Sequence, residues 1–99
     1  MDDGRRLTLP PRDIAQLRSM IVSRTIVMPD TYRSVLEVGF ADPEIIAYGN
    51  ARSIATRCGI AASTVWRIAG FLGFQSFREF KKLFRDQLVE RAERVLTKS

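Results

Sequence analysis

Arg52, Ser63 and Arg67 are the side chains of segment 51–70 whose chemistry best suits contact with a nucleic acid. A guanidinium can donate two hydrogen bonds to O6 and N7 of guanine in the major groove, and a serine hydroxyl can bond a base edge. We therefore expect Arg67 to read bases, Ser63 to serve a base or a phosphate, and Arg52 to bind a phosphate. The competing interpretation of Arg67 is a solvated arginine on a helix surface.

Catalytic and metal-binding chemistry is poorly represented in the chain. Its 99 residues include one cysteine and no histidine, which excludes an internal disulfide and removes the commonest zinc ligand and general base. The sequence has neither paired carboxylates in a likely pocket nor a phosphate-binding loop, either of which would indicate an active site. We therefore expect that the protein is not an enzyme and binds no metal or cofactor. Cys58 has no base near it in the sequence and is expected to be a small core residue rather than a nucleophile.

The spacing of apolar residues in the same segment is that of a helix-turn-helix. Ile54 and Cys58 lie four residues apart on one helix face, and Val65 and Ile68 lie three apart on the next. Gly59 between the two pairs supplies the left-handed turn that a Cβ would oppose. The residues left facing outward on the second helix are Ala62, Ser63, Trp66, Arg67 and Gly70.

The remaining segments predict further helices. These are expected over about 11–24, from Asp30 or Thr31 to Gly39, from Pro43 until Gly49, from an Asn50 cap to Cys58, over about 62–72, and from a capping box at Ser76–Glu79 onward. The last helix carries an apolar stripe of Phe77, Phe80, Phe84, Leu88, Ala92 and Val95, with its phenylalanines in the core. No segment alternates with the period of a strand, so the expected fold is all-α, a bundle of five to six helices containing a homeodomain-like helix-turn-helix.

The net charge of +5 is carried by the C-terminal half of the chain. Residues 1–51 have six basic and seven acidic side chains, whereas residues 52–99 have ten and four. This asymmetry indicates a polyanionic partner that approaches the half containing the two-helix motif. The alternative is a solvated basic helix near the C-terminus.

Residues from about 28 to 88 resemble the N-terminal DNA-binding domain of the RpiR (MurR/RpiR) family of bacterial transcriptional regulators. The resemblance is carried by ARSIATRCGIAASTVWRIAGFLGFQSFREFKKLFRDQL. Its matching elements are Ser53-Ile54-Ala55, Cys58-Gly59-Ile60, Ser63-Thr64-Val65, Arg67, Leu72-Gly73-Phe74 and the helix with Phe77, Phe80 and Lys81. The Leu-Gly-Phe element makes the likeness more specific than a generic helix-turn-helix.

The resemblance implies a regulator that binds double-stranded DNA, with the second motif helix, about 62–72, in the major groove. Groove-facing positions would be Ala61, Ala62, Ser63, Trp66, Arg67 and Gly70, and backbone contacts would come from Arg52, Lys81 and Lys82. Family members usually continue into a SIS domain that binds a phosphorylated sugar. A sugar-phosphate effector would therefore act only through a C-terminal domain that this sequence does not contain.

The sequence departs from the family's pattern in three ways. Ala61 stands where a capping serine is common, Gly70 and Phe71 replace residues that are often basic, and Trp66 replaces a smaller apolar residue. Ala62 and Trp66 remain candidates for contact with a thymine methyl. Trp66 could instead fold back over Phe71 or lie at a protein interface, so the alternative function is a helix-turn-helix scaffold that binds another protein.

The expected organisation is a flexible N-terminus (1–9), a helix-turn-helix domain (10–88), and the end of the last helix with the start of a linker (89–99). A single module makes few base contacts, so a homodimer is expected on DNA. Ile14, Leu17 and Ile21 mark a helix that either joins the protomers or covers the core. No apolar run spans a bilayer and no signal peptide is evident, so we expect a cytoplasmic protein without membrane contact.

Overall fold

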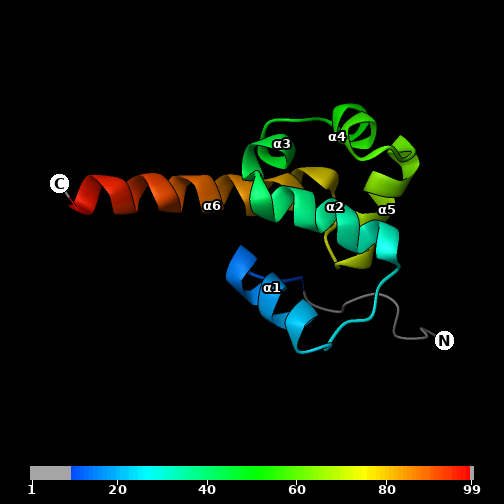
Figure 1. The fold of residues 1–99 in the computed structure, drawn as a ribbon, viewed down its shortest axis with the longest axis horizontal. Coiled ribbons are helices and arrows are strands. Elements are labelled where there is room, and N and C mark those ends of the chain that lie inside the picture. The colour runs from blue at the N-terminus through cyan, green and yellow to red at the C-terminus, as the bar shows by residue number, and fades with distance from the viewer. Residues whose placement is uncertain (1–9, 99) are drawn as a thin grey trace.

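The computed structural model describes residues 10–98, and over this range the chain forms six α-helices and no strand (Figure 1). The helices are α1 (Ile14–Val22), α2 (Asp30–Ala41), α3 (Pro43–Ala47), α4 (Ala51–Cys58), α5 (Ala62–Phe71) and α6 (Phe77–Lys98). The predicted all-α class is confirmed. The tail predicted for residues 1–9 lies outside the described residues. No helix within 10–98 is long and apolar enough to cross a membrane.

Local hydrogen bonds place helix ends at positions that differ from the predicted ones. α1 begins at Ile14 rather than near residue 11, because the Asp13 carboxylate caps it by accepting from the Gln16 amide at 2.8 Å. It ends at Val22 because Arg24 adopts a left-handed φ of 60°. The prediction for 11–24 was therefore too long at both ends.

The core is one cluster of apolar side chains to which all six helices contribute. Gly39 was predicted to end α2, but the helix continues through it to Ala41. A Cβ at Gly39 would overlap Cδ1 of Ile46 in α3 and lie 2.7 Å from Cε2 of Phe84 in α6. The glycine thus permits close packing of α2 against both helices.

α1 covers this core with its apolar face. Ile14 is 3% exposed, Leu17 is fully buried, and Ile21 is partly buried. Of the two interpretations of this helix, the structure supports the one in which it closes its own protomer's core.

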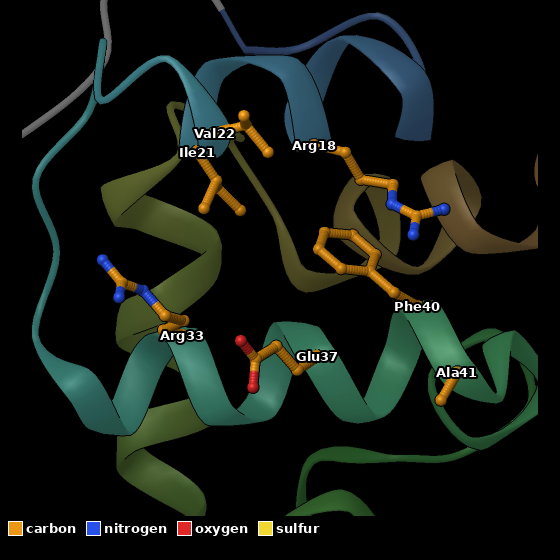
Figure 2. A pocket seen from close by; sticks show the side chains of 7 residues that line it. All are labelled: Arg18, Ile21, Val22, Arg33, Glu37, Phe40 and Ala41. Carbon is orange, nitrogen blue, oxygen red and sulfur yellow. The ribbon is translucent and has the colours of Figure 1, made fainter.

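A groove of about 380 Å³ remains between α1 and α2 (Figure 2). Arg18 lies over the ring of Phe40 with its guanidinium carbon 5.3 Å from the centroid. The groove is lined by Arg18, Ile21, Val22, Arg33, Glu37, Phe40 and Ala41. It contains no residue of the predicted DNA-binding site.

The apolar stripe predicted along α6 divides into a buried and an exposed part. Phe77, Phe80 and Phe84 are buried, as predicted, whereas Ala92 and Val95 are exposed. The reason is length, since α6 continues beyond the helices that it packs against (Figure 1).

Candidate nucleic-acid interface

α4 is fixed at both ends by hydrogen bonds. At its N-terminus, Asn50 Oδ1 accepts from the Ser53 amide at 2.8 Å, and Ser53 Oγ accepts from the Asn50 amide at 2.9 Å. At its C-terminus, Gly59 has a φ of +70° and the Ile60 amide donates to the Ala55 carbonyl at 2.9 Å. No atom lies within 4 Å of a Cβ built at Gly59, so backbone conformation rather than space requires glycine there.

α5 begins without a side-chain cap, as its sequence predicts. Ala61 is the N-cap residue, with φ −79° and ψ 146°, and its methyl group accepts no hydrogen bond. The other end is closed by the Leu-Gly-Phe element. Gly73 has a φ of 92°, and the Phe74 amide donates to the Ala69 carbonyl at 3.1 Å, which is the hydrogen-bond pattern of a Schellman motif.

The two faces of α5 have opposite surroundings. Val65 and Ile68 are fully buried, whereas Ser63 and Arg67 are exposed and Trp66 is 55% exposed. The outward direction predicted for these three residues is confirmed.

Two residues expected on the same outward face are less accessible. Ala62 is half-buried and packs against the core, and Gly70 is also half-buried. Ala62 therefore contributes to packing more than predicted, because it lies in the first turn of α5, close behind the tight connection from α4. Ala61, just before it, is exposed.

Trp66 packs on α6 rather than on its own helix. Its ring centroid lies 5.0 Å from that of Phe77, and Lys81 Nζ lies 6.0 Å from the Phe77 centroid. Phe71 instead makes an edge contact with Tyr32 of α2 at 5.5 Å. The interpretation in which Trp66 folds over Phe71 is wrong, and Trp66 and Lys81 both lie close to the same phenylalanine ring, that of Phe77.

The predicted phosphate ligands differ in their surroundings. Arg52 is exposed and, like Arg67, makes no ion pair with any residue in the described range. Lys82 is bonded to Asp86 at 2.9 Å, with the two side chains 66% and 56% exposed. An exposed pair at this spacing contributes at most about 0.5 kcal/mol, so Lys82 can exchange it for a phosphate.

The charge of this region has a single sign. From Ile45 to Arg78 the chain contains four arginines and no acidic residue. The stretch includes α4, the connecting turn, α5 and the first residues of α6. Arg78, exposed at the start of α6, was not among the predicted ligands, although the absence of acidic residues around it is visible in the sequence.

Nothing in the described range adds catalytic or metal-binding groups to this surface. No cluster of histidine, cysteine, aspartate and glutamate suitable for a metal occurs within residues 10–98. Cys58 is half-buried against the core, and burial raises the pKa of its thiol, which the Arg57 charge opposes only in part. The thiol is therefore protonated at neutral pH, and a protonated thiol is a poor nucleophile.

No family model matches the chain, and no curated protein or solved structure shows a significant similarity to it. Its function is therefore inferred from the site: an uncapped helix, α5, that follows a tight turn and presents Ser63, Trp66 and Arg67 to solvent inside an acid-free stretch.

Proposed function

We propose that the chain is a sequence-specific, double-stranded DNA-binding domain of a bacterial transcriptional regulator of the RpiR (MurR/RpiR) type. The observation that carries the proposal is the exposed face of α5 within a stretch of 34 residues, Ile45 to Arg78, that has arginines and no acidic side chain. In a helix-turn-helix complex the second helix enters the major groove while the first crosses the backbone. α5 and α4 take these places.

The exposed side chains of α5 have different chemistry and therefore different roles in binding DNA. Arg67 donates to guanine O6 and N7, Ser63 bonds a base or a phosphate, and the indole of Trp66 contacts a thymine methyl. Phe77 packs against that indole, with their ring centroids 5.0 Å apart. Lys81 Nζ lies 6.0 Å from the centroid of the same ring, so this ammonium group lies beside the groove-facing surface.

Phosphate contacts come from Arg52 on α4 and from Lys81 and Lys82 on α6. These charges carry no sequence information, but they fix the domain's register on the duplex. One α5 reads few bases, so specific binding uses two copies on two half-sites. In this proposal a sugar phosphate regulates binding only through a SIS domain outside the present sequence.

The exposed indole also favours a second candidate function, a scaffold that binds another protein through Trp66, which is 55% exposed. Phe71, the other residue considered for such a surface, is partly buried against Tyr32. The apolar surface available for this function is therefore smaller than the sequence suggests.

Selection of bound sequences from a random duplex pool, followed by titration at two salt concentrations, tests the proposal. Three phosphate ligands in each of two copies predict a loss of roughly 10³-fold in affinity between about 50 and 200 mM salt. A pool without enrichment, or an affinity that hardly changes with salt, would refute DNA binding and favour the protein-binding alternative.

The role of Arg67 is tested by Arg67→Ala, which should cost about 1–3 kcal/mol on the selected sequence and relax specificity at one position. Arg12→Ala is the matched control, because it removes the same charge from an exposed residue outside the motif. If Arg67→Ala binds the selected and a random duplex with wild-type affinities, the assignment of base reading to Arg67 is wrong.

A further inference from the structure

The C-terminal part of α6 extends beyond the core, against which Leu88 is the last residue to pack. α6 has 22 residues and is therefore about 33 Å long, and it extends well past the other helices (Figure 1). Every residue from Val89 to Leu96 is exposed. We call residues 89–96 the distal helix.

The distal helix is amphipathic. Val89, Val95 and Leu96 are 51%, 71% and 75% exposed, and with Ala92 they lie within a sector of about 120° at about 100° per residue. Glu90 and Arg94, which form an ion pair at 2.8 Å, occupy the opposite side. Short helices are marginal in water by themselves, so packing of this apolar face against a partner would stabilise the distal helix.

We propose that the partner is the distal helix of a second copy of this chain, packed alongside in parallel. Two molecules with a net charge of +5 repel each other over most of their surfaces. Between residues 89 and 96 the charges cancel, because Glu90 and Glu93 balance Arg91 and Arg94. The apolar face therefore lies where two copies can approach without that repulsion.

The edges of the apolar face determine the direction of the pair. At about 100° per residue, Arg91 lies on one edge and Glu93 on the other. In a parallel pair the edge with Arg91 faces the edge with Glu93 of the second copy, whereas an antiparallel pair places each residue beside its own equivalent. Opposite charges across such an interface favour the parallel arrangement.

The contact has a defined extent. Arg85 lies on the same side of α6 as the apolar face, nearer the N-terminus, and is exposed. The Arg85 side chains of the two copies would repel each other, which limits the pair to about three turns. An interface of this length is smaller than the roughly 1,200 Å² of a standard one, and association should be weak. The inference rests on the proposed function, because binding to two half-sites of one DNA would bring two copies of the domain together.

Sedimentation equilibrium of the whole chain without DNA, from about 1 μM to about 1 mM, tests the pair. We expect a reversible monomer–dimer equilibrium, and at least about a tenfold rise in its Kd in Val95→Glu. Val27→Glu is the matched control, because Val27 is 83% exposed but lies outside α6. A monomeric wild type, or equal behaviour of the two variants, overturns the proposal, and far-UV circular dichroism checks that both variants fold.

Disulfide trapping tests the direction separately. In a Cys58→Ser background, Ala92→Cys lies at the centre of the apolar face and should cross-link to itself in either direction, which reports the pair. Leu96→Cys should cross-link to itself only in a parallel pair, because an antiparallel pair centred on residue 92 places position 96 opposite position 88. If Ala92→Cys cross-links while Leu96→Cys does not, the parallel arrangement is overturned. Since neither experiment contains DNA, failed self-association is distinguishable from failed DNA binding.

Discussion

Replacing Ala61 by serine should stabilise the protein, because Ala61 occupies the N-cap of α5 without being able to cap it. Its backbone, with φ −79° and ψ 146°, already has the extended conformation of an N-cap residue. Its carbonyl accepts from the Thr64 amide at 3.0 Å, but its side chain offers nothing to the first-turn amides. Ala61 is exposed, so an added hydroxyl is not buried.

The start of the neighbouring helix, α4, shows the hydrogen bond that a serine at position 61 would make. At the start of α4, Asn50 Oδ1 accepts from the Ser53 amide, three residues on, at 2.8 Å. A serine at 61 can accept in the same way from the amide of Thr64 or Ser63. N-cap replacements of this kind change the free energy of unfolding by about 0.5–2 kcal/mol, and 1 kcal/mol raises the Tm of a domain this size by roughly 4–8 °C.

Thermal and urea unfolding followed by circular dichroism measure the change without DNA. Threonine and valine at position 61 provide a matched pair, since they have nearly the same shape and only threonine carries an oxygen. We expect Ala61→Ser and Ala61→Thr to be more stable than wild type, and Ala61→Val not to be. An unchanged or lower Tm in Ala61→Ser, or equal stability of the threonine and valine variants, would refute the cap assignment.

Two glycine exchanges test the other backbone positions by the same unfolding measurements. Gly39→Ala should lower the free energy of unfolding by about 1 kcal/mol. Overpacking against Ile46 and Phe84 costs about 1–3 kcal/mol, and the higher helix propensity of alanine offsets about 1 kcal/mol of this cost. If Gly39→Ala were as stable as wild type, the side chains of Ile46 and Phe84 would have to move aside. Arg24→Gly should raise the free energy of unfolding by about 0.5–1 kcal/mol. Removing the Cβ from a left-handed residue relieves about 1–2 kcal/mol of backbone strain, whereas the greater freedom of glycine in the unfolded chain costs about 0.5–1 kcal/mol. Arg24→Ala should show no such gain, and an equal gain would assign the effect to lost charge.

Those parts of the fold that depend on short sequence signals were predicted well. Asn50 caps α4, Gly59 closes it, and Gly73 ends α5. Each signal acts within a few residues, Asn50 through its side-chain oxygen and the two glycines through the positive φ that they tolerate. The box predicted at Ser76 and Glu79 is correct for one hydrogen bond. Ser76 Oγ accepts from the Glu79 amide, but the Glu79 carboxylate accepts from Gln75 rather than from Ser76.

The end of α1 shows where such signals fail. Arg24 takes the left-handed position that glycine usually occupies, with the Thr25 amide donating to the Met20 carbonyl at 3.0 Å. An arginine carries no local sign of this conformation, so the sequence predicts a longer helix. Packing of the following segment, in which Ile26 and Met28 are buried, favours the turn despite its cost.

Contacts between side chains on different helices were the least predictable part of the candidate site. Trp66 and Phe71 are five residues apart and lie about 140° from each other around α5, so they do not share a face. The true partner, Phe77, lies beyond the Gly73 turn, and only the geometry of that turn brings its ring against Trp66. The position of Lys81 follows from the same contact, since it lies one helical turn after Phe77.

The two proposals together restrict the DNA that can be bound. The exposed face of α5 carries one guanidinium, Arg67, so specificity must come from using the helix twice. A parallel pair of distal helices has its two-fold axis along the pair, and the same axis relates the two α5 helices. Two-fold symmetry of the protein requires two-fold symmetry of the half-sites. The selected sequences should therefore be inverted repeats, and a set of direct repeats would contradict the parallel pair even if DNA binding were established.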